Sequence, residues 1–158
     1  MATASARSFR TSSPISAIFL GGLLAGIGDL SFAFVFYGMR GATRMRVMQS
    51  IASGLLGRDR AIAGGWKTAL LGVVLHFTIA TVAAAVYFVA SRLFLTVRQA
   101  VICGMLYGIV IYGFMNAVVL PLAGIGTPSQ PSVIIPAIFG HMLLVGLPIG
   151  LAVKRFSR

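Results

Sequence analysis

The sequence predicts an all-α membrane protein, a polytopic bundle of four transmembrane helices. Hydrophobic residues make up 58% of the 158 residues and charged residues only 9%, with a mean hydropathy of +0.98. A soluble domain carries about a quarter charged residues, so a soluble globular class is excluded. Four apolar segments also approach or exceed the roughly 20 residues that a helix needs to cross a bilayer core. No linker or low-complexity block divides them, which makes residues 1–158 one expected membrane domain.

The expected spans are separated by short loops, and they cover residues 15–38, 66–90, 101–120 and 133–153. Pro121 ends the third span. Pro136 falls in the first turn of the fourth span, where a helix tolerates a missing N–H. Pro148 is expected to free the carbonyl of Leu144 and to kink that helix.

The loop between the first two spans has apolar residues at helical spacing over about residues 44–57. This pattern predicts a short amphipathic helix lying on the membrane surface. An ordinary basic loop is the alternative. The arginines around this segment are the candidate ligands for anionic lipid headgroups, and they are Arg40, Arg44, Arg46, Arg58 and Arg60.

Thirteen Lys and Arg residues face only Asp29 and Asp59, which gives a formal net charge of +11. Because these charges cluster between apolar segments, membrane lipids are the expected partners and nucleic acid is not. With both termini in the cytoplasm, the inner side would hold seven basic residues and the outer side six, a difference too small to fix the orientation. The seven are Arg7, Arg10, Arg92, Arg98, Lys154, Arg155 and Arg158. The basic C-terminus and the uncharged last loop favour cytoplasmic termini.

Three pairs of glycines have the GxxxG spacing that lets membrane helices approach closely. The pairs lie in the first, third and fourth spans and consist of Gly22 and Gly26, Gly104 and Gly108, and Gly146 and Gly150. We therefore expect these glycines to lie at helix–helix contacts.

Each span carries one strongly polar residue, and such residues within a membrane are functional candidates by default. Counting along each helix and correcting for its direction places Asp29, His76 and His141 at one depth. Tyr112 falls near the same depth, and Asn116 lies about one turn further on. The sequence therefore predicts an intramembrane polar layer. Helical spacing puts His141 off the Gly146/Gly150 face.

Three interpretations of this layer remain open. It can be structural, with hydrogen bonds that specify helix pairing. It can be a proton or cation path, since an Asp–His pair can exchange a proton. It can also hold a haem between His76 and His141. Neither a metal site nor any other cofactor is expected, and no catalytic motif indicates an enzyme.

Short motifs in a common order resemble the YagU-like bacterial inner-membrane proteins, a family of unknown function. They are residues 22–26, His76 with Tyr87, Gly104 and Gly108 before Asn116, Pro121-Leu122 with Gly124, Thr127-Pro128, and residues 138–141. The sequence departs from the family at Asn116, where a family member has His, and in the basic first loop. The resemblance implies a multi-pass protein of the bacterial inner membrane without a known activity, and it favours His76 and His141 over Asp29.

From the sequence we expect a structural or accessory membrane protein that acts through contacts with lipids or with partner helices, as a homo-oligomer or beside another membrane protein. The alternative function is a minimal transport bundle for protons, ions or small solutes, centred on the polar layer. Haem binding is a further alternative.

Overall fold

The computed structural model describes residues 13–93 and 99–156, and all regular structure in these ranges is helical. Four helical segments are long and apolar enough to cross a membrane: Pro14–Gly38, Gly65–Leu93, Ala100–Leu122 and Pro131–Phe156. The predicted all-α fold class with four spans is confirmed, and the chain has the architecture of a multi-pass membrane protein. Four of the seven basic residues expected on the cytoplasmic side lie outside the described residues: Arg7, Arg10, Arg98 and Arg158.

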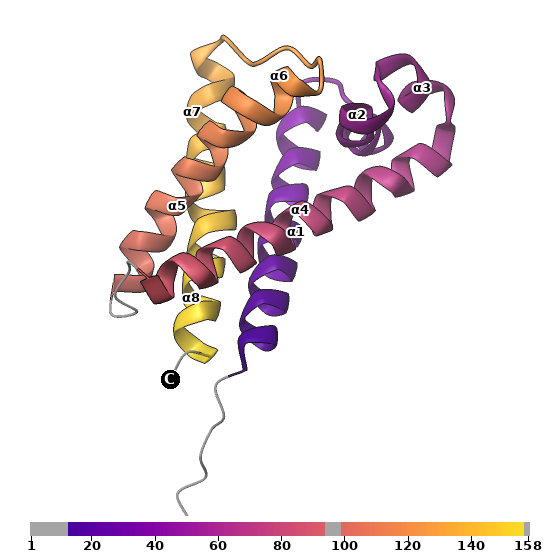
Figure 1. Ribbon diagram of the computed structural model, residues 1–158. Helices are drawn as coiled ribbons and strands as arrows, with labels where there is room; N and C mark the ends of the chain where they lie inside the picture. Colours follow the sequence, from indigo (N-terminus) through magenta and orange to yellow (C-terminus); the bar gives the residue numbers. More distant parts are fainter. Residues whose placement is uncertain (1–12, 94–98, 157–158) are drawn as a thin grey trace, which may run out of the picture.

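The first two spans are single helices, and the last two each contain a π-helical turn. The elements are α1 (Pro14–Gly38), α2 (Arg44–Leu56), α3 (Arg58–Ala63), α4 (Gly65–Leu93), α5 (Ala100–Phe114), η2 (Met115–Val119), α6 (Leu120–Leu122), α7 (Pro131–Gly140), η3 (His141–Gly146) and α8 (Leu147–Phe156). The start of α1 and the end of α8 lie at one end of the bundle, whereas α2, α3 and the loop after α6 lie at the other (Figure 1).

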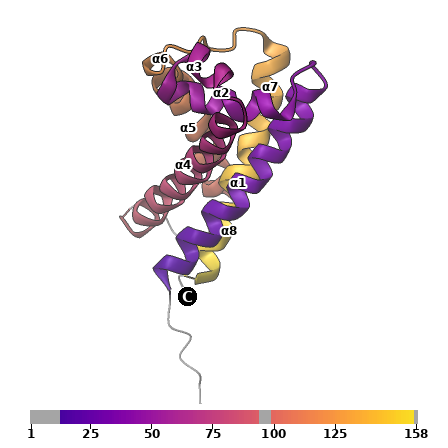
Figure 2. The ribbon, with the colours of Figure 1, turned by 90° about the vertical axis from the view of Figure 1, so that its right-hand side faces the viewer.

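The amphipathic segment forms α2, with bounds within one residue of the prediction. The side chain of Thr43 caps it by accepting a hydrogen bond from the N–H of Arg46 at 3.2 Å. Gly57, with a φ of 77°, ends α2 and starts α3, a short helix that the sequence pattern did not predict. Figure 2 shows α2 and α3 together at the end of the bundle where α4 begins. Gly72 of α4 makes this packing tight, because a Cβ there would overlap the carbonyl of Met48.

Glycines also lie at the contacts between the spanning helices. A Cβ on Gly22 would lie 2.7 Å from Cα of Thr81, so α1 and α4 meet backbone to backbone at this point. A Cβ on Gly26 would lie 2.7 Å from the ring of Phe77, also on α4. Even a methyl side chain at Gly22 or Gly26 would therefore push α1 and α4 apart, and only glycine permits contacts this close.

The two other glycine pairs face each other across the contact between α5 and the fourth span. A Cβ on Gly104 would lie 2.7 Å from the carbonyl oxygen of Gly146. A Cβ on Gly108 would overlap the carbonyl of His141, and one on Gly150 would overlap that of Ala100. Since the glycines leave both backbones without side chains at this contact, α5 packs directly against η3 and α8.

The fourth span begins earlier than the sequence indicated, and this changes the place of Pro136. It is the sixth residue of α7, which starts at Pro131, so the expected position in the first turn was wrong. Proline lacks an N–H and leaves the carbonyl four residues earlier, on Ser132, without its helical donor. Arg40 replaces that donor, because its Nη2 donates to the oxygen of Ser132 at 3.0 Å.

Pro148 marks a second irregular point of the fourth span. It follows the π-turn η3, which joins α7 to α8. The carbonyl of Leu144, four residues before Pro148, faces α1, where a Cβ on Gly28 would lie only 3.1 Å from it. The fourth span therefore changes its helical pitch at the level of His141.

Candidate functional site: a polar cavity inside the bundle

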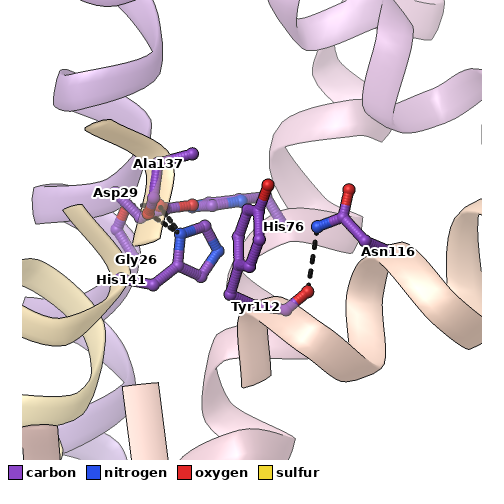
Figure 3. A network of polar contacts seen from close by, with 7 residues as sticks. All are labelled: Gly26, Asp29, His76, Tyr112, Asn116, Ala137 and His141. Carbon is purple, nitrogen blue, oxygen red and sulfur yellow. Dashed lines mark hydrogen bonds and ion pairs between the residues drawn. The ribbon is translucent and has the colours of Figure 1, made fainter. Parts of the chain in front are cut away.

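A cavity of about 250 Å³ lies between the four spans, and all five residues of the predicted polar layer line it. They come from every span: Asp29 from α1, His76 from α4, Tyr112 from α5, Asn116 from η2 and His141 from η3. Figure 3 shows these side chains converging from different helices. The structure therefore brings together the residues that depth counting along the sequence placed within about one turn of each other.

Asp29 and His141 form the closest pair of ionisable groups in this cavity. Nδ1 of His141 lies 3.8 Å from Oδ1 of Asp29, and the two side chains retain 18% and 23% of their exposure. The same Nδ1 lies 2.9 Å from the carbonyl oxygen of Ala137. Because a carbonyl oxygen can only accept, Nδ1 carries a proton and donates it to Ala137. Asp29 is thus an ion-pair neighbour of His141 and not its hydrogen-bond acceptor.

His76 is fixed by α1. Its Nε2 lies 2.9 Å from the carbonyl oxygen of Gly26, so Nε2 is the donor, and in the neutral ring Nδ1 is an acceptor. The absence of a side chain at Gly26 brings α4 close enough for this bond, beside the ring of Phe77. One glycine of the GxxxG pair therefore serves both helix packing and the orientation of a polar side chain.

Tyr112 and Asn116 form the opposite wall. The ring of Tyr112 meets that of His141 edge to face, with centroids 5.3 Å apart. Nδ2 of Asn116 donates to the carbonyl oxygen of Tyr112 at 2.9 Å. Since the amide nitrogen bonds back to its own helix, the carbonyl oxygen of Asn116 remains an acceptor.

The polar cavity contains one carboxylate, that of Asp29. Among the residues that the structure describes, no donor lies within hydrogen-bond distance of the Asp29 carboxylate. His76 donates its Nε2–H and Asn116 donates one N–H to backbone carbonyls. The other N–H of Asn116 and the Tyr112 hydroxyl have no hydrogen bond among the described residues. A carboxylate in a low-dielectric site is costly unless a positive charge or a donor neutralises it. The arrangement therefore favours a bound species that carries positive charge or several donors.

The polar cavity adjoins a larger apolar cavity of about 770 Å³ between α2, α4 and the third span. Tyr37, Ser50 and Met115 line both, so they form the boundary between them. Tyr37 was not among the predicted residues of the polar layer, although its separation of eight residues from Asp29 puts both on one helix face.

The five arginines predicted to bind lipid headgroups have different surroundings. The guanidinium of Arg40 donates to the carbonyl oxygens of Phe36 and Ser132 and lies 3.7 Å above the Phe36 ring, so it joins α1 to α7. Arg46 and Arg58 line a third cavity, of about 610 Å³, at the α2–α3 end. Arg44 and Arg60 line none of these three cavities.

Haem ligation receives no geometric support and stays a hypothesis. Nε2 of His76, a nitrogen that would have to reach iron, already donates to Gly26. Within residues 13–93 and 99–156, no three His, Cys, Asp or Glu side chains are grouped so as to hold a metal ion.

Comparisons with known proteins add no family. No protein-family model, no curated protein and no solved structure matches this chain. The resemblance to the YagU-like proteins therefore stays a prediction.

Proposed function

We propose that this protein is a minimal membrane transport bundle that binds a small cation, protons included, at Asp29. The observation that carries the proposal is the single cavity that Asp29, His76, Tyr112, Asn116 and His141 share between all four spans. A cation there would meet one carboxylate and several neutral acceptors. Its positive charge would offset the cost of placing Asp29 in a low-dielectric environment.

The Asp29–His141 contact supports exchange of the bound species over permanent capture. At 3.8 Å the pair is longer than a charge-assisted hydrogen bond, so a cation that reaches Asp29 does not have to break a short bond to His141. Protonated His141 is itself positive and would compete with that cation for Asp29. Binding at Asp29 and the charge of His141 are thereby coupled.

The test is cation flux into liposomes that contain the full-length protein. A membrane potential drives entry, and internal dyes report protons and sodium, while labelled methylammonium reports a small organic cation. We expect at least one of these three to enter faster than into empty liposomes. Asp29→Asn should abolish that difference, because the neutral amide cannot balance a cation.

Asp59→Asn is the matched control, since it makes the same chemical change in α3, outside the polar cavity. It should leave the flux at the wild-type level. Flux in none of the three assays, or equal flux in wild type and Asp29→Asn, would refute the transport function.

The accessory function, exerted through lipid or partner-helix contacts, is the second candidate. The wide lipid-facing surface of the spans supports it, since no more than 33% of the residues in the scanned window of any span are buried. Purification in mild detergent tests it: a stable membrane partner or a homo-oligomer would support this function, and a homogeneous monomer would count against it.

A bacterial inner membrane as the location, and cytoplasmic termini as the orientation, follow from the resemblance and from the charge pattern. Both stay proposals. Fusing a reporter to each terminus would test the orientation, and cytoplasmic activity of both reporters is the expected result.

A further inference from the structure

The apolar cavity is not used by the proposed cation site, and its walls differ from those of the polar cavity. It lies between α2 and α4 on one side and η2, α6 and the following loop on the other. Leu75, Val118 and Leu122 are among its apolar lining residues. A volume of about 770 Å³ falls within the roughly 300–1,000 Å³ of sites that hold a drug-sized ligand. An acyl chain is the apolar species that a membrane supplies to such a cavity.

The third cavity, of about 610 Å³, adjoins this apolar cavity at the α2–α3 end of the bundle, and we call it the basic cavity. Arg46 and Ser50 line both cavities, and Arg58 lines the basic one from α3. Among the described residues neither arginine has an acidic partner within ion-pair distance, since the only such pair joins His141 and Asp29. Two positive charges at the mouth of an apolar cavity favour the binding of an anion there.

The position of Arg46 is built into the fold. Gln49, one turn further along α2, is only 4% exposed, and its amide donates to the carbonyl oxygens of Ile62 and Gly65. These two bonds fix α2 to α3 and to the start of α4. Arg46 and Arg58 are therefore held on elements that the buried Gln49 connects.

We propose that these adjoining cavities bind one anionic glycerophospholipid. Its phosphate lies between Arg46 and Arg58, and one acyl chain lies in the apolar cavity. Guanidinium groups pair with phosphate through two parallel hydrogen bonds, and basic residues near a membrane surface attract anionic lipids. The chain would then cover the boundary residue Tyr37 and close the polar cavity toward the bilayer.

The test measures lipid binding to the delipidated full-length protein by native mass spectrometry. The probes are dioleoyl phosphatidylglycerol, which is anionic, and dioleoyl phosphatidylcholine, which has the same chains and a zwitterionic headgroup. Wild type should bind one phosphatidylglycerol in preference to phosphatidylcholine. The double variant Arg46→Gln with Arg58→Gln should weaken phosphatidylglycerol binding about 10- to 30-fold.

The matched control is Arg44→Gln with Arg60→Gln, which removes the same charge from α2 and α3 without touching the cavities. It should retain wild-type binding. Equal binding of the two lipids by wild type would overturn the proposal. An equal loss in the two double variants would overturn it as well, because the attraction would then be a general effect of positive charge.

A second pair of variants tests the acyl-chain position and does not depend on the arginine variants folding. Leu75→Trp fills the apolar cavity and should reduce phosphatidylglycerol binding. Leu70→Trp makes the same change at a residue of α4 that is 65% exposed and lines none of the three cavities, and it should have no effect. Undiminished binding by a folded Leu75→Trp protein would refute the placement. None of these variants alters Asp29, so lipid binding and cation flux succeed or fail separately.

Discussion

Nδ1 of His141 lies 3.8 Å from Oδ1 of Asp29 and 2.9 Å from the carbonyl oxygen of Ala137. His141 therefore donates its hydrogen bond within its own span. The carboxylate on α1 lies close to it without a hydrogen bond. A pair that existed to hold the two helices together would be expected at hydrogen-bond distance. The geometry is better suited to a carboxylate whose partner can change.

This geometry predicts that Asp29 contributes little to stability. Asp29→Asn should change the free energy of unfolding by less than about 1 kcal/mol, because even true interhelical hydrogen bonds in membranes average about 0.6 kcal/mol. Equilibrium unfolding of the detergent-solubilised protein is the measurement. A loss of more than about 2 kcal/mol would identify the layer as structural.

Helix packing at Gly108 should be far less tolerant. Gly108→Ala places a methyl group against the backbone carbonyl of His141, which cannot move without shifting η3. Overpacking of this kind costs about 1–3 kcal/mol. Gly113→Ala on the same helix is the control, since nothing lies within 4 Å of its Cβ position. Similar unfolding of the two variants would show that the α5–η3 contact is looser than described.

Arg40 should stabilise the fold and not bind lipid. Arg40→Ala removes two hydrogen bonds and the stacking on Phe36, and it leaves the Ser132 carbonyl without a donor. We expect a loss of about 1–3 kcal/mol. Arg44→Ala removes the same charge from a residue with no described hydrogen bond through its side chain and should be nearly neutral. Thermal unfolding of both variants decides the matter, and an unchanged Tm for Arg40→Ala would contradict the role assigned to it.

Tyr107 connects the second and third spans. Its hydroxyl donates to the carbonyl oxygen of Ala83 at 2.7 Å, and its ring packs against Tyr87. Tyr107→Phe keeps the ring and loses the bond, so it should cost roughly 0.5–1.5 kcal/mol. For Tyr112→Phe we expect no comparable loss, because no hydrogen bond of the Tyr112 hydroxyl is found among the described residues. Equal unfolding free energies for the two variants would argue against the Tyr107 bond.

The helices and the polar layer could be predicted from local features. Four apolar runs are sufficient for the four spans, whose ends fall within three residues of the predicted ones. The common depth of Asp29, His76 and His141 follows from a fixed rise per residue in antiparallel helices. Such regularities need no knowledge of which helix contacts which.

Features that depend on irregular backbone could not be predicted in this way. An α-helical periodicity separates His141 from the Gly146 face, but hydrogen bonds in a π-turn run from i to i+5. In η3 the backbone of His141 meets Gly108 while that of Gly146 meets Gly104. Arg40 donates to the carbonyl of Ser132, which Pro136 leaves without a helical donor in α7, and this contact could not be read from the sequence around Arg40. Gly72 was also missed, although it lies one turn before His76 on the same helix.

If Asp29 carries the transported cation, modification of its carboxyl group by dicyclohexylcarbodiimide should stop transport. This apolar reagent modifies protonated carboxyl groups, and mass spectrometry gives the modified fraction of Asp29 in reconstituted protein. Cation flux through the same liposomes should fall in proportion to that fraction, while Asp59→Asn protein should show the same proportionality. Undiminished flux in a sample whose Asp29 is fully modified would show that Asp29 does not carry the cation.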